Sequence, residues 1–263
     1  MRSIKVLTVR NPQGFKQVVK IVYEDEDLLV VNKPSGLRVI PDRWNKNIPN
    51  LRDLLNDFLN KKKEIKKQIV WVVHRIDSDT SGLVLFALNA QMHQQLNKAF
   101  QNRSIKKSYH TIVKGSPNQT IGKIEFSLQS DKQKKGKIQI HPKGKPAVTE
   151  YRLMEKFRDY SLLEVYPLTG RTHQIRVHLQ AMGLPLAVDP IYGNSSELGI
   201  SHLKCGVTKK ILEDKTAIIS RLTLHAYELE FNHPIRKKNL HLVAEYPKDF
   251  QALLKALRKW NTF

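Results

Sequence analysis

Short apolar runs separated by polar turns dominate the chain, and this pattern predicts strands more often than helices. Residues 18–23 and 28–32 are rich in β-branched and other apolar side chains and flank an acidic turn, which predicts a hairpin. Residues 69–73 and 83–88 have the character of buried strands on either side of a polar turn. Strand signals then dominate a long stretch that begins at Ile105.

Helical spacing of apolar residues marks several other segments. The first is a stripe of leucine and phenylalanine that ends near Lys61, and the second follows Asn89, whose side chain can cap a helix. A third spans residues 172–182 and stops at Gly183, with a proline just beyond, which is typical of a helix C-terminus. Residues 250–257 are predicted to form an amphipathic helix near the end of the chain.

The order of these elements defines the fold class. Strands with interspersed helices, without strict β–α alternation, indicate an α+β fold with a largely antiparallel, mixed β-sheet core flanked by helices. We expect residues 1–17 to be an N-terminal lead-in and residues 18–263 to form a single domain. Within that domain, residues 131–137 are predicted to be a basic hairpin tip and residues 194–215 an irregular excursion.

The charge of the chain narrows the choice of partners. Lys and Arg number 45 against 24 Asp and Glu, which leaves a formal net charge of +21. Such a field attracts polyanions and accelerates their association, so nucleic acid is the expected partner. An anionic membrane surface, or charge that only aids solubility, is the alternative reading.

The expected location follows from what the sequence lacks. No segment has the apolar length of a membrane span, and no apolar run of signal-peptide length follows the first residues, so we expect a cytoplasmic protein that does not bind membranes. Cys205 is the only cysteine, which excludes an internal disulfide and a cysteine-rich zinc cage and fits a reducing compartment.

Residues 74–83 (HRIDSDTSGL) form the segment richest in side chains that could take part in catalysis. They place cations, carboxylates and hydroxyls in a turn between apolar strands, and reactive side chains are commonly displayed on turns that a rigid sheet holds. Asp79, Thr80 and Ser81 fit an ordinary turn in which side chains bond to their own backbone. For Asp77, the residue types alone favour a structural and a functional role equally.

Residues 170–178 (GRTHQIRVH) are the second such segment. On a helix, Thr172 and Arg176 share one face at i, i+4 spacing, and the start of a helix favours a bound anion. His173 and His178 are five positions apart, whereas the histidines of a zincin helix are four apart. We therefore expect no metal here.

A third segment, residues 106–113 (KKSYHTIV), is a basic entry to a strand that contains Tyr109. A tyrosine on a strand packs in the core more often than it takes part in catalysis. Core packing is the favoured reading of Tyr109 from its residue type alone.

Taken together and in this order, the three segments resemble the RluA-type family of RNA pseudouridine synthases. That family carries an H-R-L-D-x-x-T-S-G-L motif, a K-x-Y strand motif and a G-R-T-H-Q-I-R-x-H helix. Ile76 stands where the family usually has Leu, and Thr111 where it often has Ala. The resemblance covers about residues 18–247 and continues through further stretches: 145–151, 189–193, 224–229 and 233–234. Many members also carry a small N-terminal RNA-binding domain, for which we expect no room in this chain.

The resemblance implies a fold, a reaction and a catalytic set. It implies the pseudouridine synthase fold with an active-site cleft across the sheet, and isomerisation of specific uridines in ribosomal or transfer RNA without a cofactor. Asp77 is implied as the nucleophile or base on a flipped-out uridine, with Tyr109 and Arg176 completing the catalytic site. Arg176 would orient the Asp77 carboxylate, and Tyr109 would stack on the uracil or take part in proton transfer.

Seven further residues are implied to contact RNA. Arg75 is the candidate to fill the position that the flipped base leaves, although a phosphate contact or a structural pair fits it nearly as well. The complete set is Arg75, His74, Thr80, Lys107, Arg171, His173 and Gln174. We expect a monomer with RNA as its partner, with no metal and no protein partner.

Two other functions remain open at this level. A noncatalytic basic RNA-binding protein explains the charge but not the combination of Asp77, Tyr109 and Arg176. A glycoside hydrolase also acts at an anomeric carbon, but it usually needs two carboxylates about 5–10 Å apart. Asp77 and Asp79 are the only obvious pair, and turn chemistry explains Asp79 better. A hydrolase would release free uracil, whereas an isomerase leaves the mass of the RNA unchanged.

Overall fold

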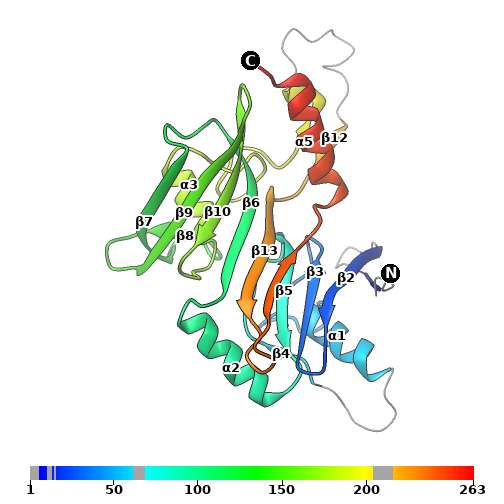
Figure 1. The fold of residues 1–263 in the computed structure, drawn as a ribbon. Coiled ribbons are helices and arrows are strands. Elements are labelled where there is room, and N and C mark those ends of the chain that lie inside the picture. Colours follow the sequence, from blue (N-terminus) through cyan, green and yellow to red (C-terminus); the bar gives the residue numbers. More distant parts are fainter. Residues whose placement is uncertain (1–5, 11–13, 15, 62–68, 204–215) are drawn as a thin grey trace. The chain divides into compact units, whose positions relative to one another are not determined.

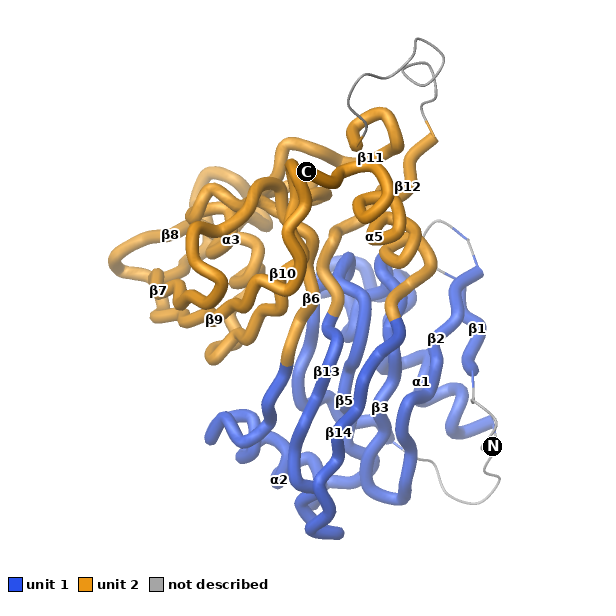
Figure 2. The backbone as a smooth tube through the Cα atoms, turned by 45° about the horizontal axis from the view of Figure 1, so that its top comes forward, with its two compact units in different colours: residues 1–107, 226–245 blue, residues 108–225, 246–263 orange. Residues whose placement is uncertain are grey.

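The computed structural model describes residues 6–10, 14, 16–61, 69–203 and 216–263 (Figure 1). The described chain clusters into two compact units (Figure 2). Unit 1 comprises Met1–Lys107 and Ala226–Glu245, and unit 2 comprises Ser108–His225 and Tyr246–Phe263. The chain passes between the units three times: within β6 (Lys106–Lys114), within β13 (Leu224–Asn232) and between Glu245 and Tyr246. The expected single domain over residues 18–263 stays a prediction.

Unit 1 is built on a sheet whose strands pair in the order β1, β2, β3, β5, β13. The hairpin predicted near residues 18–32 is confirmed, because β2 and β3 pair antiparallel. Two short additions complete the sheet: β4 pairs with β5, and β14 pairs with β13, both antiparallel. The bounds are β1 (Val6–Arg10), β2 (Lys16–Glu24), β3 (Leu28–Lys33), β4 (Trp71–Val72), β5 (Ser81–Ala87) and β14 (Asn239–Val243).

The expected N-terminal lead-in, residues 1–17, is described only in part. Residues 6–10 form β1 and pair antiparallel with β2, so this stretch extends the sheet of unit 1. The physical reason is the alternation of Val6, Thr8 and Arg10 with Leu7 and Val9, a period of two that suits an edge strand.

The helices of unit 1 begin where asparagine caps them. α1 (Leu51–Asn60) is capped by Asn50, whose side chain accepts from Asp53 N, and it ends before Lys61 as predicted. α2 (Ala90–Gln101) is capped by Asn89, which accepts from Met92 N at 2.8 Å, also as predicted. Met92 and Leu96 of α2 pack into the core of the unit together with leucines from β3 and β5. This burial of apolar area fixes the helix against the sheet.

Unit 2 contains a second antiparallel arrangement, with strand order β6, β10, β9, β7, β8. The basic hairpin tip predicted at 131–137 joins β7 to β8, and Asp131 stabilises it by accepting from the backbone N–H groups of Gln133 and Lys134. The bounds are β7 (Ile121–Ser130), β8 (Ile138–Ile140), β9 (Lys145–Lys156) and β10 (Tyr160–Pro167).

Part of the predicted excursion at 194–215 is described. It contains β11 (Leu198–Gly199), which pairs with β12 (Ala217–Ile219), and the 3-10 helix η1 (Ile200–His202). Residues 204–215, and with them Cys205, lie outside the described residues. The closing helix α5 (Lys248–Trp260) is longer than predicted, and Phe250, Leu253 and Leu257 bury its apolar face in unit 2.

The helix α3 (Gln174–Ala181) begins two residues later than predicted. His173 precedes it with a left-handed backbone (φ 54°), which a right-handed helix cannot continue through. Thr172 therefore lies outside the helix, and its predicted shared face with Arg176 is wrong. The predicted end is correct, because Gly183 (φ 75°) donates to Gln180 O and closes the last turn.

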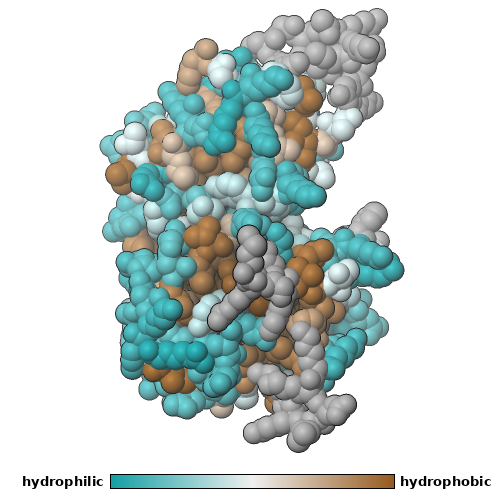
Figure 3. Space-filling model, turned by 45° about the vertical axis from the view of Figure 1, so that its right-hand side comes forward, coloured by the Kyte–Doolittle hydropathy of each residue, from teal (hydrophilic) through white to brown (hydrophobic). Residues whose placement is uncertain are grey.

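No helix within the described ranges is both long enough and apolar enough to cross a membrane. On the face drawn in Figure 3, hydrophobic areas are interrupted by hydrophilic ones.

Candidate active site

Asp77 lies in unit 1, in the turn that leads from β4 into β5. Its carbonyl oxygen accepts from Thr80 N at 3.2 Å, and Ser78 Oγ donates to Asp79 Oδ1 at 3.1 Å. This is the hydroxyl and carboxylate turn that the residue types predict. The Asp77 side chain is partly exposed, whereas Thr80 is 1% exposed. Burial favours a structural role for Thr80 over direct contact with RNA.

The segment 33–37 holds this turn in place. Gly36 N donates to Ser78 O at 2.9 Å, and Ser35 Oγ donates to Asp79 O at 2.7 Å. Lys33 Nζ donates to the same Ser78 oxygen at 2.7 Å. The backbone on the C-terminal side of Asp77 is therefore fixed by contacts from a neighbouring strand end.

Lys33 is a buried cation whose ammonium group donates hydrogen bonds to backbone carbonyls. Its side chain has no exposed surface, and Nζ also donates to Pro34 O at 2.9 Å and Leu37 O at 2.7 Å. An ammonium has three N–H donors, and these carbonyls together with Ser78 O use all of them. The arrangement offsets the high cost of removing a charge from water. Sequence reasoning took Lys33-Pro34-Ser35-Gly36 only as a break in the strand pattern and missed this role.

Gly82 explains the tight approach of the strand that follows the turn. A Cβ atom at this position would lie 2.1 Å from the carbonyl oxygen of Ala226, which belongs to the neighbouring strand β13. Its φ of 114° is also unfavourable for other residues. Glycine is therefore required where β5 leaves the Asp77 turn.

His74 and Lys107, both in unit 1, lie near enough for the lysine charge to act on the His74 ring. The His74 ring accepts from Leu85 N through Nε2 at 2.9 Å and packs on Phe100, with ring centroids 4.8 Å apart. Burial, together with the charge of Lys107, lowers the pKa of His74 to about 3, so the ring is neutral at pH 7. Burial also lowers the pKa of Lys107. Arg75, between His74 and Asp77 in the chain, is exposed with Ile76 buried beside it.

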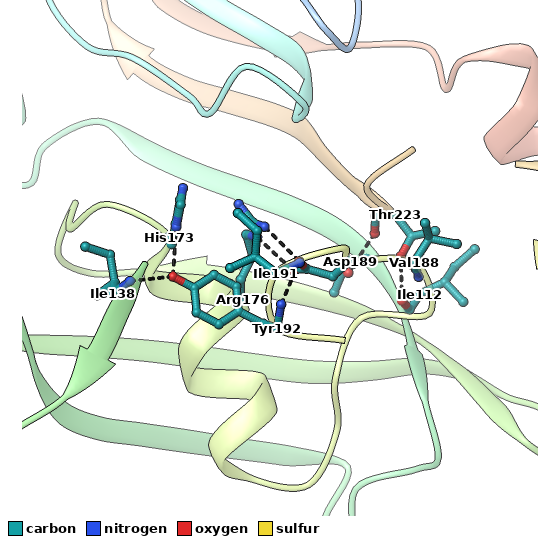
Figure 4. Close-up of polar contacts among 10 residues, drawn as sticks. Ile112, Ile138, His173, Arg176, Val188, Asp189, Ile191, Tyr192 and Thr223 are labelled. Carbon is teal, nitrogen blue, oxygen red and sulfur yellow. Dashed lines mark hydrogen bonds and ion pairs between the residues drawn. The ribbon is translucent and has the colours of Figure 1, made fainter. Parts of the chain in front are cut away.

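Arg176 and Asp189 form a buried ion pair in unit 2 (Figure 4). Arg176 is 2% exposed, and its Nε and Nη2 donate to the two carboxylate oxygens of Asp189 at 2.7 Å each. Asp189 Oδ1 also accepts from the backbone N–H groups of Ile191 and Tyr192. Burial raises the pKa of Asp189, but the hydrogen bonds and charge of Arg176 and these backbone donors outweigh it, so the pKa lies below its usual value.

Tyr192 supports the same arginine from another side. The Arg176 guanidinium carbon lies 4.9 Å from the centre of the Tyr192 ring, a distance typical of a cation–π contact. The Tyr192 hydroxyl accepts from Ile138 N at 2.7 Å and lies 2.9 Å from His173 Nδ1 (Figure 4). Tyr192 therefore fixes both Arg176 and the left-handed His173.

The other predicted site residues of unit 2 differ in how far their side chains are exposed. Gln174 is buried, with Oε1 accepting from Arg171 N and Nε2 donating to Val148 O, so its amide is committed to the fold. Arg171 is exposed, and its Nε donates to Pro146 O at 3.2 Å. Tyr109 on β6 is partly buried and packs against the core of the unit.

The predicted site residues thus fall into two groups. Unit 1 contains His74, Arg75, Asp77, Thr80 and Lys107, and unit 2 contains Tyr109, Arg171, His173, Gln174 and Arg176. The expected pairing of Asp77 with Arg176 joins the two groups and stays a prediction. Sequence reasoning missed Lys33, Asp189 and Tyr192. Residues 189–193 are among the stretches that resemble the family, but the sequence assigned Asp189 no partner. A buried arginine requires a carboxylate, and this requirement could have identified Asp189.

Asp25, Asp27 and His233 form a group whose ligand atoms lie within 4.8 Å of one another, close enough to consider for a metal ion. His233 Nδ1 accepts from Arg236 N at 3.0 Å, so the neutral ring has its proton on Nε2 and donates it to Asp25 Oδ2 at 3.1 Å. Asp25 Oδ1 meanwhile accepts from Asp27 N. A metal would need the nitrogen lone pair that this proton occupies. The group fits a hydrogen-bonded clamp between two hairpins of unit 1 better than a metal site.

Comparison with known proteins agrees with the geometry of the fold. The human protein RNA Pseudouridylate Synthase Domain Containing 4 superposes with a TM-score of 0.71 at 26% identity, covering 90% of this chain and 92% of that one. The class defined by this fold is the pseudouridine synthases. A family profile described as RNA pseudouridylate synthase matches residues 27–181.

Curated relatives extend the match to most of the chain. Ribosomal large subunit pseudouridine synthase D of Haemophilus ducreyi is 36% identical over 240 residues, which are 91% of this chain and 71% of the relative. The uncharacterized RNA pseudouridine synthase YlyB of Bacillus subtilis is 34% identical over 258 residues, which are 96% and 79% of the two chains. The chain belongs to the RluA-type RNA pseudouridine synthase family. It is an isomerase that acts on RNA, which decides against the noncatalytic and hydrolytic alternatives.

Proposed function

We propose that this enzyme converts specific uridines of ribosomal or transfer RNA to pseudouridine, with Asp77 acting on a flipped-out uridine. Ribosomal RNA is favoured because relatives named as ribosomal large subunit synthases align with 91% of the chain. The observation that carries the proposal is the Asp77 turn, a partly exposed carboxylate on a backbone that Lys33, Ser35 and Gly36 hold in place.

The reaction needs a carboxylate and no redox partner. The glycosidic bond between ribose C1′ and uracil N1 breaks, the uracil turns, and a bond forms between C1′ and C5. The proton on C5 leaves and N1 gains one, so the product is an isomer of the substrate. The Asp77 carboxylate can form a covalent intermediate or remove a ribose proton on a glycal route. Both routes require it to be ionised when the uridine arrives.

Arg176 and Tyr109 are proposed to complete the reaction. Asp189 already neutralises much of the Arg176 charge, so we expect Arg176 to orient the Asp77 carboxylate more than to stabilise its charge. Support comes from the restraint of its guanidinium by Asp189 and Tyr192. Tyr109 would stack on the uracil or pass the proton from C5.

RNA binding would combine base flipping with phosphate contacts. Extrusion of a paired base costs a few kcal/mol, and exposed Arg75 is proposed to occupy the vacated position. Lys107, Arg171, His173 and the tip at 131–137 are proposed phosphate contacts, consistent with the net charge of +21. His74, Thr80 and Gln174 are proposed to support the RNA-binding segments from within.

The test is a map of pseudouridines across total RNA from cells with and without the gene. We expect at least one position, in ribosomal RNA, to lose its modification in the deletion strain. The wild-type gene should restore that position, and a gene encoding Asp77→Ala should not. A map that is identical in both strains, or restoration by Asp77→Ala, would contradict the proposal.

A further inference from the structure

Trp44 is a large aromatic side chain in an unusually exposed place. It is 83% exposed, and it lies in the segment between β3 and α1 of unit 1. Most tryptophans bury their ring, because its apolar area is large. An indole held almost wholly in water is therefore a candidate contact surface.

The loop that carries Trp44 is closed at its base. Arg38 and Asn50 form a parallel β-bridge, Leu51 N donates to Arg38 O at 2.8 Å, and Arg52 N donates to Val39 O at 3.1 Å. The two ends of residues 40–49 therefore lie side by side. Compact loops with adjacent ends are frequently functional.

Within the loop, Asp42 fixes the backbone of Trp44. Asp42 Oδ1 accepts from Trp44 N at 2.8 Å and from Asn45 N at 2.9 Å, and its other oxygen pairs with Arg38. Asn45 Oδ1 in turn accepts from Asn47 N at 3.0 Å. Because the turn is already ordered, binding through the indole would lose little backbone entropy.

The charge around the ring selects the kind of partner. Arg43 and Lys46 are both exposed and flank Trp44, while Asp42, the only acidic residue in 40–49, is paired with Arg38. The loop therefore offers an aromatic face between two cations. A base of single-stranded RNA presents a matching π-face between two phosphates, whereas the bases of a duplex are stacked on one another.

The loop is also tied to the frame that holds Asp77. Leu37 O, just before the loop, and Ser78 O, just after Asp77, accept from the same Lys33 ammonium. We propose that Trp44 is a stacking platform for an unpaired base of the RNA that carries the target uridine. The inference rests on the proposed function, since that function supplies the RNA.

The test is the affinity of the full chain for a single-stranded oligouridylate. Trp44→Ala should weaken binding about 5-fold to about 150-fold, the range measured when a stacking aromatic is removed. Its salt dependence should match that of the wild type, because no phosphate contact is lost. Trp44→Phe should keep most of the affinity, and the quenching of tryptophan fluorescence by RNA should be smaller in it than in the wild type. The matched control is Phe263→Ala, at another exposed aromatic residue (81% exposed), which should bind as the wild type does.

Three results would overturn the inference. The first is an RNA affinity of Trp44→Ala equal to that of the wild type. The second is an equal loss of affinity for a single strand and for the oligouridylate–oligoadenylate duplex. The third is a change in the oligomeric state of Trp44→Ala without a change in its RNA affinity. Pseudouridine formation by the wild type in the same preparations separates this inference from the proposed function. No formation on total RNA rejects the function, whereas normal formation with RNA affinity unaffected by Trp44→Ala rejects only the platform.

Discussion

The Lys33 ammonium donates a 2.7 Å hydrogen bond to the carbonyl oxygen of Ser78, the residue that follows Asp77. A fully buried cation thus holds the backbone of the residue next to the proposed catalytic carboxylate. This link makes the position of Asp77 depend on a side chain that contributes no reactive group.

Lys33→Met should therefore lower both stability and activity. It leaves the Leu37 carbonyl without its ammonium donor and Ser78 O with Gly36 N as its remaining donor, and a buried unsatisfied acceptor costs about 1–3 kcal/mol. Urea unfolding measures the first effect, and the rate of pseudouridine formation at saturating RNA measures the second. The control is Ser35→Ala, which removes one hydrogen bond to Asp79 O and should cost about 0.5–1.5 kcal/mol. Equal effects of the two variants would contradict the importance of the ammonium.

Asp189→Asn should be among the most damaging single changes in unit 2. It leaves the Arg176 guanidinium buried without its ionic partner, and breaking such a pair costs about 3–5 kcal/mol. Tyr192→Phe is the milder comparison, because it keeps the ring beside Arg176 and removes only the hydroxyl contacts with His173 and Ile138. Thermal unfolding of both variants checks the order. If Tyr192→Phe were the less stable of the two, the hydroxyl would be the main support.

Stability should fall in mild acid because two histidines are held neutral. Burial lowers the pKa of His178 to about 4, opposed by the Phe126 backbone, and the pKa of His74 is about 3. In the unfolded chain a histidine has a pKa of about 6.5, so between these values the unfolded state binds more protons. The contribution of these histidines to the free energy of unfolding is therefore complete above about pH 6.5. It is lost as the pH falls toward 4, by up to about 1.4 kcal/mol per pH unit for each histidine.

Urea unfolding at pH 7, 6 and 5 measures this loss, and His178→Leu should reduce its slope by the share of one histidine. Neither ring nitrogen of His178 makes a hydrogen bond of normal geometry to the described part of the chain, which is why removing the ring isolates the titration. A slope that is unchanged in His178→Leu would show that other groups titrate in this range.

Binding to RNA should weaken with salt in a way that identifies phosphate contacts. Arg171→Ala should reduce the slope of log K against log salt by about 0.7, the value for one phosphate on a single strand. Arg258→Ala is the control, since its guanidinium is already paired with Glu155 on the same unit. The two variants should differ in slope; an equal change in both would assign the effect to net charge alone.

The sequence predicts those parts of the fold that local chemistry decides. The cap at Asn89, the hairpin between β2 and β3 and the helix end at Gly183 each depend on residues within one turn, and each is confirmed. The start of α3 is not local. His173 takes a left-handed backbone while its ring contacts the hydroxyl of Tyr192, 19 positions away, and no periodicity in residues 172–182 contains that contact.

The same distinction applies to the candidate site. Asp77 and Arg176 can be recognised in the sequence because they lie in recognisable motifs. The residues that hold them in place cannot be recognised in this way. Lys33 is 45 positions from Ser78, and Asp189 is 13 positions from Arg176. A buried lysine or aspartate is recognisable only when burial and partners are known, because both residue types are usually exposed.

The most direct measurement of the central claim is the rate of pseudouridine formation by purified Asp77→Asn on RNA from a strain lacking the gene. The substitution keeps the size of the side chain and removes its charge, and we predict a loss on the order of 10³-fold or more while RNA affinity is retained. Asp79→Asn, two positions along the same turn and exposed, should keep most of the wild-type rate. Comparable rates for Asp77→Asn and the wild type would contradict the account.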